Sequence, residues 1–159
     1  MNYIFASRLS SVESFLSCCL RAYGTIGPRR RSNSFKSRSA HTRKKIRPII
    51  LVMIDENPKG FYDEIFWNTE LVDKYSLMLV KELIPFIDRN YRTIQTSESR
   101  MNFGISFSGY ISLLTTIQHS NIFSRVSCQS SVYWAGEREK RIKDLIAQTS
   151  TKSIEIYMD

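Results

Sequence analysis

The chain has 159 residues, of which 42% are apolar and 12% are aromatic, which suffices for one globular domain with a hydrophobic core but not for two ordinary domains. No uninterrupted apolar run approaches the roughly 18 residues that a membrane span needs, so integral membrane insertion is not expected. The three cysteines, Cys18, Cys19 and Cys128, have the spacing neither of a disulfide framework nor of a metal site. The sequence therefore predicts a protein of a reducing compartment, cytoplasmic by default, that needs no metal or other cofactor.

The net charge of +8 is unevenly distributed. Residues 1–47 hold 11 of the 23 Lys and Arg residues and one of the 15 acidic residues, a net +10, which leaves −2 for residues 48–159. Because residues 27–47 are rich in Arg, Lys and Ser and poor in apolar side chains, we expect residues 1–47 to form a flexible basic arm in front of a folded domain, 48–159. Three interpretations of the arm stay open: a solvated linker, a non-specific contact with a polyanion, and an organelle transit peptide.

From Pro48 onward, strand patterns and helix patterns alternate. Residues 49–54 form a continuous apolar run, typical of a strand covered on both faces. Residues 71–89 carry the longest helical pattern, and Pro85 is expected to kink it or to tighten its last turn. Further strands are predicted at 100–105, 125–129 and 153–158, and further helices at 109–119 and 137–147. This βαβαβαβ order predicts an α/β fold with a mostly parallel sheet and helices on both faces.

Three loops are expected to meet at the carboxyl edge of this sheet, where ligands bind in such folds: residues 55–69, 106–109 and 130–136. The first and the last of them contribute aromatic residues: Phe61, Tyr62, Trp67, Tyr133 and Trp134. These side chains could line an apolar pocket for an acyl or aromatic group, or simply cover the sheet edge, and the sequence leaves both interpretations open.

Residues 103–109 read Phe-Gly-Ile-Ser-Phe-Ser-Gly, an apolar strand that runs through a serine between small residues into an amphipathic helix. In a nucleophile elbow, the serine occupies a sharp, strained strand-to-helix turn, and the positions two before and two after it approach closely. Here those positions are Gly104 and Ser108, where the strict pattern has glycine at both. The pattern makes Ser106 the candidate nucleophile.

Several consecutive motifs resemble the esterase D and enterochelin-esterase-like branch of the α/β-hydrolases, which includes feruloyl and acetylxylan esterases. They are Arg47-Pro48-Ile49-Ile50-Leu51-Val52-Met53, the helix segment 80–88 followed by Asn90-Tyr91-Arg92-Thr93, Ser99-Arg100 leading into Gly104–Tyr110, and Gln129-Ser130. The resemblance covers about 110 residues, from 46 to 159, and leaves out the basic arm.

The resemblance implies that Ser106 is acylated and that the backbone N–H of Phe107 is one donor to the oxyanion. In this fold the acid and then the histidine follow the nucleophile along the chain. Asp159, at the end of the last predicted strand, is the candidate acid, whereas His119 matches a structural turn of the family and is not expected to act as the base. The His-Gly loop that supplies a second oxyanion donor is also missing.

The sequence thus predicts a partial α/β-hydrolase: a serine carboxylic-ester hydrolase that acts on a small-molecule ester without a cofactor and, as a truncated family member, is weakly active or inactive by itself. A loss of one triad member commonly costs about four decades in rate. The alternative is a non-catalytic structural or polyanion-binding protein that uses the basic arm; no specific nucleic-acid partner is predicted.

Overall fold

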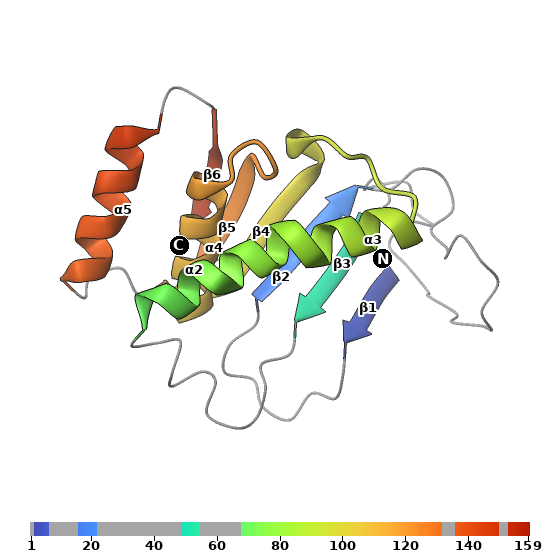
Figure 1. The fold of residues 1–159 in the computed structure, drawn as a ribbon, viewed down its shortest axis with the longest axis horizontal. Coiled ribbons are helices and arrows are strands. Elements are labelled where there is room, and N and C mark those ends of the chain that lie inside the picture. The colour runs from blue at the N-terminus through green and yellow to red at the C-terminus, as the bar shows by residue number, and fades with distance from the viewer. Residues whose placement is uncertain (1, 7–15, 22–48, 55–67, 132–135, 150–152) are drawn as a thin grey trace.

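The computed structural model describes residues 2–6, 16–21, 49–54, 68–131, 136–149 and 153–159, which build one six-stranded sheet crossed by helices (Figure 1). The strands are β1 (Asn2–Ala6), β2 (Leu16–Arg21), β3 (Ile49–Ile54), β4 (Arg100–Ile105), β5 (Arg125–Gln129) and β6 (Glu155–Met158), in the spatial order β1-β3-β2-β4-β5-β6. The pairs β1–β3, β4–β5 and β5–β6 are parallel, and β2 runs antiparallel to both of its neighbours. The predicted mostly parallel sheet is confirmed.

The alternation of strands and helices after residue 48 is also confirmed. Between β3 and β4 lies one long helical segment, made of α2 (Thr69–Met78), the π-helix η2 (Leu79–Leu83) and α3 (Ile84–Asn90), followed by the short 3-10 helix η3 (Ser97–Ser99). Then come α4 (Phe107–Gln118) and α5 (Glu137–Gln148). Three strands, β3, β4 and β5, have the predicted bounds: β3 is a continuous apolar run, whereas β4 and β5 also contain polar residues.

The described helices all lie on one face of the sheet, whereas the sequence predicts helices on both. Side chains of α2, α4 and α5 share one hydrophobic cluster, which helices on opposite faces could not do. The strand order explains this arrangement: the steps β3 to β4, β4 to β5 and β5 to β6 all move in the same direction, and right-handed crossovers then place every helix on the same side. On the other face, Met101, Phe103 and Ile105 of β4 are half-buried.

The first helix begins at a local signal. Asn68 is the N-cap of α2, and its Oδ1 accepts hydrogen bonds from the backbone N–H groups of Glu70 (3.0 Å) and Leu71 (3.3 Å). Pro85 stands in the first turn of α3, directly after η2. Because proline cannot donate a backbone hydrogen bond, the wider turn of η2 accommodates it and the helix continues as α3 to Asn90, so the alternative of a tightened last turn at Pro85 is wrong.

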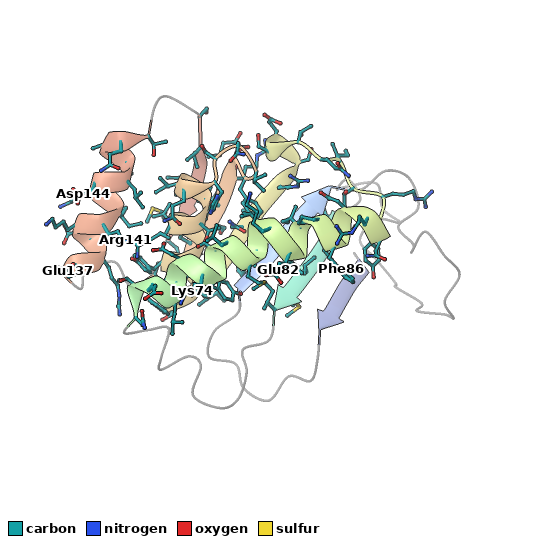
Figure 2. The ribbon with its side chains drawn as sticks, in the orientation of Figure 1. Lys74, Glu82, Phe86, Glu137, Arg141 and Asp144 are labelled. Atoms are coloured by element: carbon teal, nitrogen blue, oxygen red, sulfur yellow. The ribbon has the colours of Figure 1, made fainter. Side chains whose placement is uncertain are left out.

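Two clusters form the core of the described residues. One joins α2, α4, β5 and α5. The other packs η2 and α3 on β3 and includes Phe123, which belongs to the segment of the chain between α4 and β5. The second cluster consists of Ile50, Val52, Val80, Ile84, Ile87 and Phe123. Charged side chains lie on the outer side of the helices, as Lys74, Glu82 and Glu137 show, and Phe86 is an exposed apolar exception (Figure 2).

A buried ion pair anchors the start of β4. The guanidinium of Arg100, 5% exposed, donates a 2.6 Å hydrogen bond to Oδ2 of Asp88 at the end of α3, and the hydroxyl of Thr93 donates to the other carboxylate oxygen at 2.6 Å. The pair joins the start of β4, the strand that leads to Ser106, to the end of α3. Removing either member would leave an uncompensated buried charge, so the pair is needed for stability.

Two strands in the N-terminal third are not predicted by the sequence analysis. β1 lies at the edge of the sheet beside β3, and β2 separates β3 from β4. Both are short apolar segments in a basic, polar context, and their pairing with residues far along the chain is not visible in local sequence. β1 and β2 lie within residues 1–47 and pair in the sheet, so these two segments do not form the flexible arm that was predicted. The Arg- and Lys-rich run of residues 27–47 lies outside the described residues, so its role as an arm stays a prediction.

Candidate functional site

Ser106 occupies a sharp turn between β4 and α4. Its backbone has φ 57° and ψ −124°, a left-handed conformation that costs a non-glycine residue about 1–3 kcal/mol and that persists only where the surroundings enforce it. Its N–H donates to the carbonyl of Gln129 at 2.8 Å, and its carbonyl accepts from the N–H of Gly109 at 3.1 Å. Ser106 is half-buried and precedes the helix, so the strand, turn and helix that the motif predicts are all present.

The turn is close enough to exclude a side chain at Gly104. A Cβ at this position would lie 2.2 Å from the carbonyl oxygen of Ser108 and 2.6 Å from the nitrogen of Gly109, both of them backbone atoms. At Gly109, a Cβ would lie 1.8 Å from Oγ of Ser131. The close approach predicted around Ser106 is therefore present at Gly104, whereas at Gly109 the nearest atom is the side-chain oxygen of Ser131, which can move, and the backbone oxygen of Gly104 lies at 3.2 Å.

Ser108 fits the turn in place of the glycine of the strict pattern. Its hydroxyl accepts from the N–H of Ile105 at 2.9 Å and donates to the carbonyl of Ile105 at 2.6 Å. The side chain is 1% exposed and thus satisfies both backbone groups of the last residue of β4. From the sequence, Ser108 is expected only to be small enough for the turn, because the backbone groups that its hydroxyl contacts cannot be predicted from the sequence.

Phe107 is the first residue of α4, so its backbone N–H belongs to the N-terminal end of the helix dipole. Its ring is 1% exposed and stacks on the ring of Tyr110, with 5.7 Å between centroids and 20° between planes. The guanidinium carbon of Arg138 lies 4.9 Å from the centroid of the Phe107 ring. Burial raises the pKa of the Tyr110 hydroxyl, which remains neutral near neutral pH. The ring of the residue that follows Ser106 thus contacts both Tyr110 and Arg138.

The neighbouring strand ends complete the edge around Ser106. Ser130, directly after β5, also has a positive φ of 46°, and its N–H donates to Oδ1 of Asp159 at 2.6 Å. Asp159 follows β6, and both residues are exposed. The carboxylate of Asp159 therefore lies at the same sheet edge as Ser106, where it accepts from the backbone of Ser130. Ser130 directly follows Gln129, whose carbonyl accepts from the N–H of Ser106.

His119 lies at the opposite end of α4 from Ser106. It is the C-cap of the helix, and its carbonyl accepts from the N–H groups of Ile122 (2.8 Å) and Phe123 (3.0 Å). Twelve residues of α-helix separate it from Ser106 by about 18 Å. Burial, helped by the charge of Lys81, lowers the pKa of the imidazole. The position of His119 agrees with a structural role and is out of reach of the Ser106 hydroxyl.

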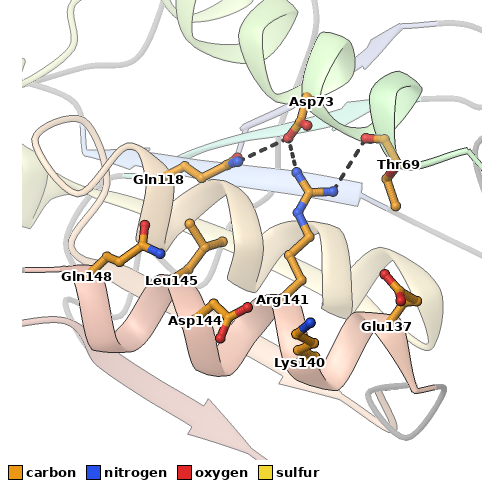
Figure 3. A pocket seen from close by; sticks show the side chains of 9 residues that line it. All are labelled: Thr69, Asp73, Gln118, Glu137, Lys140, Arg141, Asp144, Leu145 and Gln148. Atoms are coloured by element: carbon orange, nitrogen blue, oxygen red, sulfur yellow. Dashed lines mark hydrogen bonds and ion pairs between the residues drawn. The ribbon is translucent and has the colours of Figure 1, made fainter.

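A polar pocket of the described residues lies between α2, the end of α4 and α5 (Figure 3), and neither Ser106 nor Phe107 lines it. Its centre is Asp73, whose Oδ1 accepts from Nε2 of Gln118 at 3.0 Å and from the guanidinium of Arg141. Arg141 also approaches the carbonyl of Thr69 at 3.5 Å. Burial acts to raise the pKa of Asp73, but the hydrogen bonds from Arg141 and Gln118 outweigh it and leave the pKa below its usual value. These contacts bind three helices together.

The remaining predicted site residues fall outside the described residues. They are Phe61, Tyr62, Trp67, Tyr133 and Trp134, whose role as pocket lining stays a prediction. Within the described part of the chain, no group of His, Cys, Asp and Glu side chains has the arrangement of a metal site. The same residues include no helix that combines the length and the apolar character needed to cross a membrane.

Comparisons with known proteins identify the family of the chain. Residues 31–159 match the sequence profile of the family described as "Putative esterase". The chain is also similar to the uncharacterized protein YjcH of Bacillus subtilis (strain 168), with 29% identity over 84 residues, which cover 52% of this chain and 33% of that protein. The matched segment thus spans about a third of the length of this relative.

Proposed function

The chain belongs to the "Putative esterase" family, which supports a hydrolase function of the esterase type, and from this premise we propose that Ser106 is the nucleophile of a serine carboxylic-ester hydrolase. The observation that carries the proposal is the backbone of Ser106, which keeps a left-handed conformation between a buried strand and a helix N-terminus. A strain of this kind, held by hydrogen bonds to Gln129 and Gly109, is typical of functional turns.

In the proposed reaction, Oγ of Ser106 attacks the carbonyl carbon of a small-molecule ester, and its proton passes to a base. The negative charge that develops on the carbonyl oxygen is stabilised by the backbone N–H of Phe107 at the positive end of α4. The alcohol then leaves with a proton, the acyl group stays on Ser106, and water releases it as a carboxylic acid.

The base determines how fast this reaction runs. A serine hydroxyl is a weak nucleophile near neutral pH unless an oriented base accepts its proton. Of the two histidines, His41 lies outside the described residues, and His119 lies at the far end of α4. Without an oriented histidine, acylation slows by about four decades relative to a complete triad. We therefore propose that this chain reacts slowly with activated esters and turns over poorly.

Asp159 remains the candidate acid of the sequence analysis, and the hydrogen bond from Ser130 suggests how it would be oriented. A carboxylate that accepts from a backbone N–H keeps a second oxygen for another donor. In the proposal, Asp159 supports the edge of the site and is the group to which a histidine would turn its N–H.

The release of p-nitrophenolate from p-nitrophenyl acetate tests the proposal. Wild-type protein, Ser106→Ala and the control Ser130→Ala are compared, since Ser130 is an exposed serine at the same edge. We expect an initial release of up to one p-nitrophenolate per chain in the wild type and in Ser130→Ala, and none above background in Ser106→Ala. Equal release by all three proteins would contradict the role of Ser106.

A further inference from the structure

Arg138 has an unusual environment for its residue type and position. It lies in the first turn of α5 and is only 9% exposed, although arginine is seldom buried. Its guanidinium carbon lies 4.9 Å from the ring centroid of Phe107 and 5.9 Å from that of Tyr110. Both distances fall within the range of cation–π contacts.

The helix itself does not account for this placement. The first turn of a helix favours acidic side chains, and the neighbours Glu137 and Glu139 follow that rule and are exposed. A buried cation at the same turn must be stabilised by other contacts. The two stacked rings of α4 supply them, because the ring faces are electron-rich and accept a planar guanidinium well.

The contact falls on the residue whose backbone N–H is the proposed oxyanion donor. The Phe107 ring contacts Tyr110 of its own helix and Arg138 of the next helix, and the guanidinium lies near both rings. These two contacts restrict the ring, which limits the movement of the Phe107 Cα and hence the direction of its N–H. The positive charge of Arg138 also adds to the positive potential at the start of α4.

We propose that Arg138 is a positioning residue for the Ser106 turn: it holds the first turn of α4 through the Phe107 ring, so that the N–H of Phe107 points at the oxyanion. This inference rests on the proposed function and adds to it a residue that does not touch the substrate. It also assigns α5 a role in the site, since the helix delivers this one side chain to the turn.

Two variants of Arg138 and one matched control test the inference. Arg138→Met keeps an apolar stem of similar length without the charge and the plane, and Arg138→Lys keeps the charge. The control, Arg141→Met, removes a second arginine of the same helix, one turn further on, which pairs with Asp73 and acts on the Tyr110 hydroxyl, whereas Arg138 lies over the Phe107 ring. The rate constant of Ser106 acylation by p-nitrophenyl acetate and the thermal midpoint are measured for each protein.

We expect Arg138→Met to slow acylation about tenfold, because a small misplacement of a catalytic donor costs this much or more, and Arg138→Lys to recover most of the loss. Arg141→Met lowers the thermal midpoint and leaves the acylation rate within about twofold of the wild type, since its ion pair lies outside the turn. Equal acylation rates in folded Arg138→Met and wild type, or equal slowing by Arg141→Met, would overturn the inference.

Amide hydrogen exchange at Phe107 separates a failure of this inference from a failure of the proposed function. If wild-type Ser106 is not acylated at all, the proposed function fails, and the positioning of an oxyanion donor fails with it. If wild type is acylated, the N–H of Phe107 should exchange about tenfold faster in Arg138→Met than in Arg141→Met. The reason is that the contact between Arg138 and the Phe107 ring limits local opening of the first turn of α4. Equal exchange in the two variants would show that Arg138 does not hold the turn.

Discussion

The two ends of α4 are held in different ways. Its N-terminal end follows Ser106 in a turn built from backbone hydrogen bonds, two glycines and the buried hydroxyl of Ser108. Its C-terminal end is held by hydrogen bonds between Gln118, Asp73 and Arg141. The first arrangement depends on close contact between backbone atoms and contains no titratable group. The second depends on charged side chains that remain partly exposed. The comparison indicates that changes at the first end should act on the reactivity of Ser106, and changes at the second end on stability and its pH dependence.

The largest effect is expected at Gly104. In Gly104→Ala, the new Cβ would meet the backbone of Ser108 and Gly109 at 2.2–2.6 Å, and backbone atoms cannot move aside as a flexible side chain could. We expect a loss of about 3 kcal/mol in the free energy of unfolding and no acylation of Ser106. Urea denaturation, followed by circular dichroism, measures the first quantity.

Gly136→Ala is the matched control for Gly104→Ala. Gly136 has a positive φ of 42°, but a Cβ there would meet no atom within 4 Å. The substitution should therefore cost only the backbone strain, about 1 kcal/mol. A similar loss at both glycines would mean that the turn around Ser106 is not as tightly packed as these distances indicate.

A smaller effect is expected at Ser108. In Ser108→Ala, the N–H and the carbonyl of Ile105 each lose a buried partner, which should cost about 1–2 kcal/mol. Ser108→Gly restores the strict motif but also lacks the hydroxyl, so it should be no more stable than the alanine variant. If Ser108→Gly were more stable than the wild type, the hydroxyl would not brace the turn.

The smallest effect concerns pH. The pKa of His119 is lowered by burial and by Lys81, so the unfolded chain binds a proton more readily, and stability should decrease as the pH falls below about 6.5 toward the folded-state pKa. The pKa of Asp73 is also lowered, and its contribution should be lost as the pH falls below 3.8. Thermal midpoints measured from pH 8 to pH 3 show both decreases in stability, the one below about pH 6.5 and the one below pH 3.8.

His119→Gln should flatten the decrease in stability below pH 6.5 and change the decrease below pH 3.8 only slightly, because the charge of His119 is the smallest cause of the lowered pKa of Asp73. Asp73→Asn should remove the decrease below pH 3.8. Ser108→Ala should lower the whole curve without altering its slope, because its contacts involve no titratable group. An unchanged slope between pH 7 and pH 5 in His119→Gln would contradict the assignment of this window to His119.

Much of this arrangement can be predicted from sequence, because its signals are local. The apolar run of β3 is continuous, the segment of β4 is short and mostly apolar, and the small residues around Ser106 indicate the strained turn directly. The predicted helix begins at residue 71, two residues after the observed start of α2, because the apolar periodicity does not show the capping hydrogen bonds of Asn68.

Other features depend on contacts between distant residues and were missed for that reason. Nothing in the segments of β1 and β2 indicates which strands they pair with, and the one-sided placement of the helices follows only from the strand order. Arg138 is one of several charged residues in α5, and local sequence does not distinguish it from Arg141. The packing of α5 beside α4 brings its guanidinium onto Phe107.

The most direct test of the central claim is to locate the adduct that a fluorophosphonate ester forms with the protein. Peptide mapping by mass spectrometry, after limited labelling of the wild type and of Ser106→Ala, identifies the modified residue. We predict that the phosphonyl group is found on Ser106 in the wild type and is absent from the variant. Labelling at other residues, at the same rate in both proteins, would contradict the assignment of Ser106 as the nucleophile.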